Sequence, residues 1–259
     1  MRVVVCAKVI PDSSVTLTID PATNRLSRKD LPHELDAAAA SAVEEALRLT
    51  EQHGGDVTVV TMGIADATIG IRRALAMGAT AAIHLLDDAL AGSDTLGTAK
   101  ALAAAIRREE FDLVICATES SDSYSGIVPV QIARLLGIPP LTFAKRVSVE
   151  GSTVTIHRQT ETGYTVARAE MPALLSVTSG INEPRYPQLK GIMAARKIEI
   201  KTLTAADLEL GPDQVGESGA RERVLAVGEP PARLSGRVIQ DEGDGGVQIA
   251  DFLASLGVI

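Results

Sequence analysis

Small hydroxyl side chains and glycine are concentrated in one segment of the sequence, from Ala117 to Gly126. The segment follows an apolar run typical of a buried strand and precedes an apolar run typical of a helix. Such a loop presents backbone N–H groups and side-chain O–H groups to an anion, so it predicts the binding of a nucleotide phosphate. A simpler interpretation is that Ser121, Asp122 or Ser123 caps the following helix. The residues of the loop alone leave both interpretations open.

Other phosphate-binding and catalytic motifs are absent from the sequence. There is no GxxxxGK(S/T) loop and no GxGxxG fingerprint, which argues against P-loop hydrolysis and a standard NAD site. There is also no GxSxG elbow and no HExxH helix. The histidines lack metal-ligand spacing, and we expect each to lie on the surface or to have satisfied hydrogen bonds. They are His33, His53, His84 and His157.

Two carboxylates, Glu44 and Glu45, are adjacent in a helical pattern. We expect them to form the solvated face of that helix or to pair with Arg48, because residues four apart in a helix are neighbours. They do not resemble an acid–base pair, and the sequence as a whole predicts no catalytic residue.

The segments that must position the phosphate loop alternate between short β-branched runs and long alanine-rich amphipathic runs. The predicted strands are Arg2–Val9, Asp56–Met62, Ala81–Leu86 and Phe111–Ala117. The predicted helices are Asp36–His53, Ala65–Met77, Asp94–Arg108 and Ser123–Leu136, the last ending at Gly137. This alternation predicts an α/β fold with a mostly parallel, Rossmann-like sheet.

The middle of the chain is predicted to form an antiparallel flap at about residues 147–170. Its strands are Val147–Glu150, Thr153–Arg158 and Tyr164–Glu170, after which Ala173–Val177 returns to the core. The polar segment Lys201–Val215 is predicted to be a short connection. It would complete a nucleotide-binding α/β domain of residues 1–215.

Residues 216–259 are predicted to form an extended C-terminal arm. Gly216–Gln240 carries charges, glycine and proline without a period, and cannot build a core of its own. An acidic hinge, Asp241–Gly246, leads to a short amphipathic helix at Val247–Leu256. A lone helix of this length needs a docking surface, either on its own domain or on another subunit.

A parallel sheet would bring several ligand-type segments to one edge. Ligands of open α/β sheets bind beyond the carboxyl ends of the strands, where helix N-termini collect unpaired amides and positive dipole ends. The segments predicted at this edge are Cys6–Lys8, Asp36–Ala39, Met62–Gly63 and Ala117–Gly126.

A further segment, residues 181–197, matches no regular period and is expected to be a shaped loop. Pro184 and Pro187 fix φ there and push the preceding residues towards extended conformations. The loop combines apolar with basic side chains, namely Leu189, Ile192 and Met193 with Arg185, Lys190, Arg196 and Lys197. It is either a packed connection whose charges are solvated, or a surface that meets a partner with its apolar side chains surrounded by basic ones.

Composition restricts the partners and the compartment. The net charge of -8, from 25 basic and 33 acidic residues, argues against nucleic acid and anionic membranes as partners. No stretch reaches the roughly 18 apolar residues of a membrane span, and Met1–Ile10 is too short for a signal peptide. Cys6 and Cys116 are expected to be free thiols in a reducing compartment. The sequence therefore predicts a cytoplasmic protein that is not inserted in a membrane.

Several motifs resemble those of the β subunit of electron-transfer flavoproteins. They are Val5–Lys8 with Pro11–Asp12, Ala42–Ala46, Ile71–Ala79, Asp112–Val114, the Asn182–Tyr186 signature and Glu242–Gly246. The resemblance covers nearly the whole chain and implies an adenine nucleotide α-hydrolase-like fold and an αβ heterodimer. In this family the α subunit holds most of a redox-active FAD. The β subunit buries an AMP, or a second FAD that meets NADH in the electron-bifurcating branch.

Carried over position by position, the resemblance implies a nucleotide site made largely of backbone amides. Its residues are Cys6, Asp36, Ala37, Ala38, Ala39, Met62, Ala117, Thr118, Glu119, Ser120, Ser121, Asp122, Ser123, Tyr124, Ser125, Gly126, Ile127 and Val128. The resemblance also implies that Leu189 inserts into a pocket of a partner dehydrogenase. The implied partner-binding residues are Arg185, Leu189, Lys190, Ile192, Met193 and Lys197.

The sequence departs from the family pattern near both nucleotides. Residues 122–129 read DSYSGIVP, where many relatives carry a D-x-D/N-x-T-x-Q type of sequence, and this departure disfavours a second FAD. Ser13 stands where some members place a tyrosine against the flavin, and Gln159 where they place a glutamate. The environment and potential of the flavin are therefore expected to differ.

The resemblance implies an electron carrier without catalytic residues of its own. With its α subunit it would take electrons from FAD-dependent dehydrogenases, such as the acyl-CoA dehydrogenases of fatty acid β-oxidation, and pass them to electron-transfer flavoprotein–quinone oxidoreductase. One alternative is an ATP pyrophosphatase of related fold, which requires an SGGxDS-type loop that the chain lacks. Another is a stand-alone adenine-nucleotide-binding module, which would be stable as a homodimer.

Overall fold

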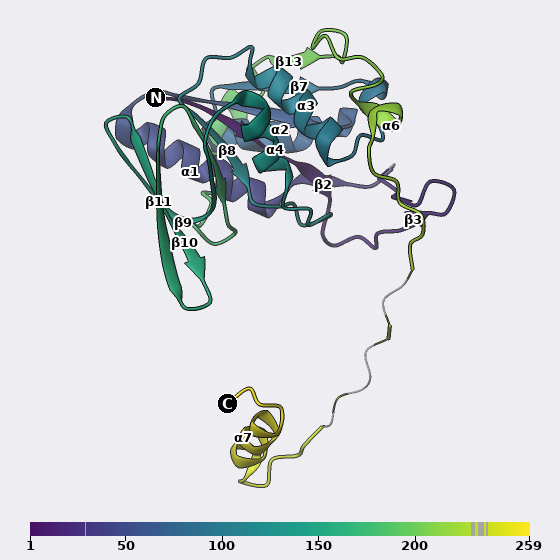
Figure 1. Ribbon diagram of the computed structural model, residues 1–259, viewed down its shortest axis with the longest axis vertical. Coiled ribbons are helices and arrows are strands. Elements are labelled where there is room, and N and C mark those ends of the chain that lie inside the picture. The colour runs from purple at the N-terminus through teal and green to yellow at the C-terminus, as the bar shows by residue number, and fades with distance from the viewer. Residues whose placement is uncertain (29, 229–230, 233–235, 237) are drawn as a thin grey trace. The chain divides into compact units, whose positions relative to one another are not determined.

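The computed structural model describes residues 1–28, 30–228, 231–232, 236 and 238–259 (Figure 1). Residues 229–230, 233–235 and 237 of the predicted arm lie outside this description. The chain divides into two compact units, Met1–Val224 and Leu225–Ile259. The second unit contains helix α7 (Gly245–Ser255), preceded by a turn in which the Asp241 carboxylate accepts hydrogen bonds from two backbone N–H groups.

The first unit is built on a nine-stranded sheet with the strand order β11-β10-β9-β12-β8-β1-β6-β7-β13. The strands are β1 (Arg2–Cys6), β6 (Asp56–Met62), β7 (Ala81–Leu85), β8 (Leu113–Ala117), β9 (Pro140–Glu150), β10 (Thr153–Thr160), β11 (Gly163–Glu170), β12 (Ala173–Val177) and β13 (Ile200–Leu203). Neighbouring strands from β9 across to β13 are parallel, whereas β10 pairs antiparallel with β9 and β11. The predicted α/β class, with a mostly parallel sheet and antiparallel flap strands, is confirmed.

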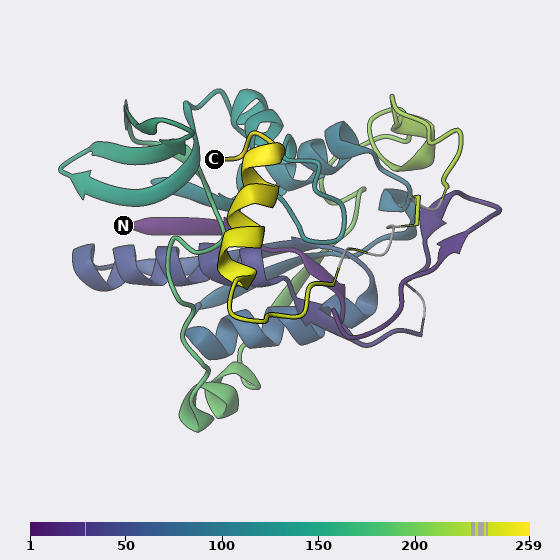
Figure 2. The same cartoon turned by 90° about the horizontal axis from the view of Figure 1, so that it is seen from below.

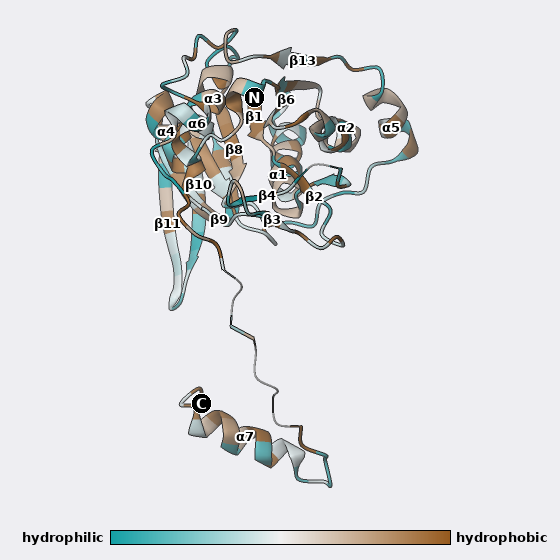
Figure 3. Ribbon diagram, turned by 90° about the vertical axis from the view of Figure 1, so that its right-hand side faces the viewer, coloured by the Kyte–Doolittle hydropathy of each residue, from teal (hydrophilic) through white to brown (hydrophobic). Residues whose placement is uncertain are grey.

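Helices cover both faces of the parallel strands. On one face lie α1 (Ala37–His53) and α2 (Thr68–Met77), and on the other lie α3 (Thr95–Ile106) and α4 (Val128–Leu136) (Figure 2). Because successive strand side chains point to opposite faces, Val3 and Val5 join the core under α1, while Val4 joins the core under α3. Strands buried on both faces form continuous apolar runs, which Figure 3 shows as brown ribbons at β1 and β8.

Strand β9 connects the parallel sheet to the flap. Its first residues pair with β12, and the strand then bends to pair with β10. At the bend Phe143 adopts a φ of 60°, and its N–H donates to Ser176 Oγ at 3.0 Å. This hydrogen bond satisfies an amide that the register shift leaves out of the ladder. Because its first residues already pair with β12, the strand begins at Pro140, ahead of the predicted start at Val147.

The predicted strand Arg2–Val9 was wrong at its end, because β1 stops at Cys6. The chain leaves the main sheet there, and β2 (Val9–Pro11) pairs antiparallel with β5 (His33–Leu35) in a small separate sheet. A two-stranded hairpin, β3 (Ile19–Asp20) with β4 (Arg25–Leu26), lies between them in the sequence. The apolar run continues across both strands, so its period did not reveal the crossing.

Other short elements also differ from the prediction. A polar connection was predicted from Lys201, but Ile200–Leu203 forms the edge strand β13, parallel to β7. The predicted loop at residues 181–197 contains a helix, α5 (Leu189–Ala195). Strand β13 and helix α5 are too short to show a period and depend on packing against neighbours. Helical turns also occur at η1 (Ala65–Ala67), η2 (Asp88–Leu90) and α6 (Gly216–Gly219).

The start of α4 is Val128 rather than Ser123. Tyr124 and Gly126 adopt positive φ angles of 47° and 65°, which a right-handed helix does not allow. The segment before Val128 is therefore a folded loop and not the first turns of a helix.

Gly70 marks the close packing of α2 on the small sheet. A Cβ added there would lie 2.4 Å from Val9 Cγ2 and 3.2 Å from the backbone of Leu35. In an exposed helix the change from glycine to alanine stabilises by about 1 kcal/mol. Here we expect Gly70→Ala to lower the free energy of unfolding by about 1–3 kcal/mol, because the added carbon overpacks the site. Urea denaturation measures this, and a gain in stability would contradict the packing described.

Candidate functional site

The carboxyl ends of β1, β6 and β8 lie side by side at one edge of the sheet, because these strands are parallel neighbours. Cys6, Met62 and Ala117 are their last residues. The N–H of Asp36, at the start of α1, donates to the carbonyl of Lys8 at 3.1 Å, which holds that helix start at the same edge. The structure thus brings together the segments predicted to form a nucleotide site.

Asp36 joins the start of α1 to the loop after β8. It is the N-cap of α1, and its Oδ1 accepts from the N–H of Ala38 at 3.1 Å. The same carboxylate accepts from the N–H and the hydroxyl of Ser121, at 3.0 and 2.9 Å. Asp36 is buried, so these donors supply the hydrogen bonds that its oxygens would otherwise receive from water. Ser121, one of the residues predicted as a possible cap of α4, therefore contacts α1 instead.

The Asp122 carboxylate is the buried centre of the loop. Lys8 Nζ lies 2.6 Å from Asp122 Oδ1, and Arg28 Nη2 lies 2.6 Å from Oδ2. Lys8 also donates to the hydroxyls of Ser120 and Ser123, each at 3.1 Å. Burial alone raises the pKa of Asp122, but the hydrogen bonds and charge of Lys8, with the hydrogen bond from Arg28, lower it to about 2. Asp122 is therefore ionised and paired within the protein.

The two cations of this network were absent from the predicted site residues. Lys8 follows the end of β1, inside a segment already predicted at the ligand edge, and a basic residue beside a phosphate-type loop is the signal that identifies it. Arg28 lies 94 residues before Asp122 in a stretch without a pattern. No feature of the sequence pointed to Arg28.

Helix α4 begins without a side-chain cap. Its N-cap residue is Ile127, which makes no side-chain capping hydrogen bond, and Pro129 lies in the first turn. The capping interpretation for Ser121, Asp122 or Ser123 was wrong, because these residues lie well before the helix. Backbone N–H groups in the first turn of a helix have no intrahelical partner, and the dipole there is positive. This end of α4 has the chemistry of an anion site.

The histidines near the ligand edge are both buried. His84 Nε2 lies 3.1 Å from the carbonyl oxygen of Gly63, and burial lowers the pKa of His84, so this ring is satisfied and neutral. His33 differs from the expectation, since neither of its ring nitrogens has a hydrogen-bond partner within the described residues. Across the residues that the structure describes, no group of three or more His, Cys, Asp and Glu is placed to hold a metal ion.

Glu44 and Glu45 are buried, with exposed fractions of only 3% and 8%. The predicted pair with Arg48 is present, since Arg48 Nε donates to Glu44 Oε1 at 2.9 Å. Arg185 Nε also donates to Glu44, and Asn182 Nδ2 donates to Glu45, at 2.8 and 2.9 Å. The expectation of a solvated face was wrong, because the start of the segment predicted to bind a partner covers this face of α1.

Helix α5 presents most of the predicted partner-binding residues to solvent. The exposed fractions are 73% for Leu189 and 59% for Met193, and that of Tyr186, just before the helix, is 88%. Lys190 and Lys197 are exposed as well. Figure 3 shows α5 beside α2, with hydrophobic residues along its ribbon. Apolar and basic side chains thus share one exposed surface.

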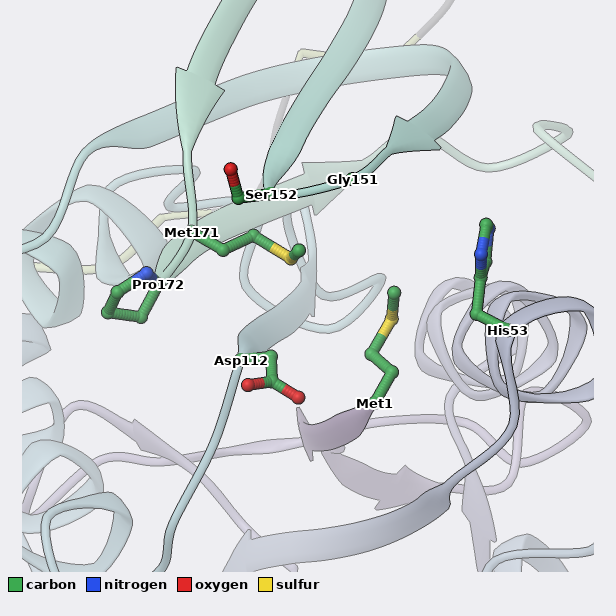
Figure 4. Close-up of a pocket in the computed structure, with 7 residues that line it drawn as sticks. All are labelled: Met1, His53, Asp112, Gly151, Ser152, Met171 and Pro172. Carbon is green, nitrogen blue, oxygen red and sulfur yellow. The ribbon is translucent and has the colours of Figure 1, made fainter.

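A separate open cleft of about 570 Å³ lies at the amino ends of the parallel strands (Figure 4). It is lined by Met1, His53, Asp112, Gly151, Ser152, Met171 and Pro172. None of these residues was predicted as a site residue, and the cleft lies at the opposite end of the strands from the candidate site. Among the described residues, no helix combines the length and apolar character required to cross a bilayer.

Fold and site together define an open, doubly wound α/β protein with a ligand-type strand edge and a separate exposed apolar helix. A family model described as "Electron transfer flavoprotein domain" matches residues 23–208. The chain is 42% identical to the electron transfer flavoprotein subunit beta of Mycobacterium leprae, over 100% of this chain and 99% of that protein.

Two further relatives match over 92% of this chain and 92% of their own length. The electron transfer flavoprotein subunit beta of Thermoanaerobacterium thermosaccharolyticum is 39% identical, and the caffeyl-CoA reductase-Etf complex subunit CarD of Acetobacterium woodii is 36% identical. The chain belongs to the electron transfer flavoprotein family, among its β subunits. The resemblance found in the sequence is confirmed, and membership implies an α-subunit partner.

The buried charge network predicts sensitivity to acid. The pKa of Asp122 is lowered in the folded protein, so its ionised form adds stability above its ordinary pKa of 3.8, and this stability is lost as the pH falls from about 4 towards 2. We expect Lys8→Met to raise that pKa towards its ordinary value, so that the variant is less stable than the unmodified protein near pH 6 and loses less further stability between about pH 4 and 2. Denaturation curves between pH 2 and 6 measure this.

A matched control is Lys201→Met, which removes an exposed lysine 3.6 Å from Glu109. Surface pairs contribute little, so its pH profile should follow the unmodified protein. If the Lys8→Met profile followed it too, the pairing of Lys8 with Asp122 would not control the titration.

Proposed function

We propose that this chain is the β subunit of a heterodimeric electron-transfer flavoprotein that relays electrons between other flavoproteins. The donors are FAD-dependent dehydrogenases such as acyl-CoA dehydrogenases, and the acceptor is electron-transfer flavoprotein–quinone oxidoreductase. The observation that carries this proposal is Leu189, a large apolar side chain exposed on α5 beside basic residues, in a chain of this family. An apolar side chain left in solvent adds no burial free energy to the free chain, whereas a partner with an apolar pocket would bury Leu189 together with Ile192 and Met193 on the same helix.

We further propose that an AMP binds at the carboxyl edge of the sheet. Asp122 is already neutralised by Lys8 and Arg28, so the phosphate would be held by what remains: the backbone N–H groups around Ser125–Val128 and the uncapped turn of α4. Ala37 is small and exposed, so the nucleotide would approach the backbone at the start of α1 there, whereas Ala38 and Ala39 are buried behind it. The remaining residues of the predicted site would form its walls. They are Cys6, Met62 and residues 117–124.

The FAD, held mainly by the α subunit, supplies the redox chemistry when it is bound. The β chain contributes one wall of its site and positions the heterodimer against its donors. Residues 216–259, the predicted arm, would dock on the α subunit. The two free cysteines, Cys6 and Cys116, are consistent with a cytoplasmic location.

A second candidate is an electron-bifurcating β subunit with a second FAD and a site for NADH. In this candidate the partner would be a reductase, as in the caffeyl-CoA reductase-Etf complex to which the relative from Acetobacterium woodii belongs. Residues 122–129 favour AMP, because they lack the D-x-D/N-x-T-x-Q type of sequence found in many relatives. Counting the bound flavins distinguishes the two candidates.

Lys190 and Lys197, both exposed, would steer an acidic donor towards Leu189. We expect Leu189→Ala to raise the KM of the heterodimer for a reduced acyl-CoA dehydrogenase roughly 30-fold, since burying a leucine contributes about 2 kcal/mol. The flavin content should be unchanged, because Leu189 lies on a different part of the unit from the nucleotide edge. Stopped-flow reduction of the bound flavin measures the rate.

Leu17→Ala is the control, because Leu17 is another exposed leucine and lies outside α5. It should leave electron acceptance unchanged. Unchanged KM in the Leu189→Ala variant, or loss of its flavin, would remove the docking role from Leu189.

A further inference from the structure

The start of the segment at residues 181–197 is fixed to α1 by two buried carboxylates. Glu44 Oε2 accepts from Arg185 Nε at 2.8 Å and from the Arg185 backbone N–H at 3.1 Å. Glu44 Oε1 accepts from Arg185 Nη2 at 3.1 Å. One carboxylate thus holds both the guanidinium fork and the backbone of Arg185. This fixes the direction in which the segment at residues 181–197 passes α1.

Arg185 uses the rest of its guanidinium group for a second carboxylate of the same helix. Its Nη2 donates to Glu51 Oε2 at 3.0 Å, and its Nη1 pairs with Glu51 Oε1. The hydrogen bonds to Glu51 and Glu44 raise the pKa of Arg185 further. Arg185 was predicted to contact or steer a partner, but its charge is taken up within the chain.

A second contact between the segment and α1 joins Asn182 to Glu45, the residue after Glu44 in the helix. Asn182 Nδ2 donates to Glu45 Oε2 at 2.9 Å and to the backbone carbonyl of Ser41 at 3.0 Å. Burial raises the pKa of Glu45, and the hydrogen bond from Asn182 opposes this effect. Asn182 and Arg185 therefore attach the start of the segment to α1 at two points.

The other end of the segment is fixed to α2. Gly191 packs so closely that an added Cβ would lie 2.4 Å from the carbonyl oxygen of Ala76. Arg72 Nη1 donates to the carbonyl oxygens of Ala195 and Ile198, at the end of α5. Helix α5 is too short to be stable alone, so these contacts to α2 and the contacts to α1 determine where it lies.

We propose that Glu44 and Arg185, with Glu45 and Asn182, form a clasp that positions α5 for docking and that does not itself touch the partner. This inference rests on the proposed function for the identity of the partner, a reduced FAD-dependent dehydrogenase. The clasp keeps Leu189 in its exposed place before the partner arrives, so binding does not have to order the segment. Its members are positioning residues.

Loss of the clasp and loss of the exposed lysines are expected to affect the salt dependence of the KM differently. Lys190 and Lys197 act through solvent, where ions screen charges over about 8 Å at physiological ionic strength. Glu44 is buried and acts on the geometry of α5. Loss of the clasp therefore changes the KM for the donor without changing the salt dependence of that KM, whereas loss of Lys190 changes both.

The test compares Glu44→Gln with Glu51→Gln in the FAD-loaded αβ heterodimer. Both changes remove one charge from α1 and one partner of Arg185, but the Glu44 side chain is 4% exposed and that of Glu51 is 57% exposed. For Glu44→Gln we expect a roughly tenfold higher KM for a reduced acyl-CoA dehydrogenase, with kcat and flavin content unchanged. Amide hydrogen exchange at residues 185–195 should become faster. Glu51→Gln should change the KM less than about twofold.

Two further variants keep the test decisive if Glu44→Gln does not fold. Gly191→Ala should displace α5 from α2 without changing any charge and raise the KM in the same way. Arg185→Lys keeps the charge but loses the planar fork of the guanidinium group, so it should also raise the KM. In a Glu44→Gln, Leu189→Ala double variant the two effects should not add, because both act through the same docked leucine.

Unchanged hydrogen exchange at residues 185–195 in Glu44→Gln would overturn the clasp. Faster exchange with an unchanged KM, while Leu189→Ala raises the KM, would overturn its role in docking. Faster exchange with no KM effect from either variant would contradict the proposed donor and leave the clasp as the structure that orders α5, so the two failures are distinguishable.

Discussion

The burial of three carboxylates on helix α1 is the constraint on which both candidate surfaces depend. Asp36 begins the helix, and Glu44 and Glu45 lie on the following turns. A buried carboxylate without partners is costly, so each must be met by donors from elsewhere in the chain. Asp36 receives them from the loop after β8, and the glutamates receive them from the start of the segment at 181–197. One helix thereby fixes two loops.

The parallel sheet determines where those loops lie. Because β1, β6 and β8 run in one direction, the start of α1 and the loop after β8 meet at the carboxyl edge, where the nucleotide is proposed to bind. Later turns of α1 pass along the sheet face and reach Asn182 and Arg185. The ligand edge and the exposed helix α5 are therefore separate in space but attached to the same helix.

The sequence was sufficient where structure is set by local pattern. Continuous apolar runs identified β6, β7 and β8, and alanine-rich periodicity identified α1, because both patterns reflect burial against the sheet. The ligand edge followed from the rule for parallel sheets. Pattern failed where long-range contacts decide the outcome: Glu44 was expected in solvent because its partner Arg185 lies 141 residues away. The short elements α5 and β13 likewise owe their existence to neighbours, and Arg28 joined the site without any local signal.

The most direct measurement is the release and mass analysis of bound nucleotides from the αβ heterodimer, purified with the unmodified chain and with Asp36→Ala. We expect one FAD and one AMP in the first case. In the second we expect the FAD to be retained and the AMP to be lost, because the loop after β8 no longer has its buried anchor on α1. Two FAD molecules in the unmodified heterodimer, or an AMP content that Asp36→Ala leaves unchanged, would contradict an AMP site that depends on this anchor.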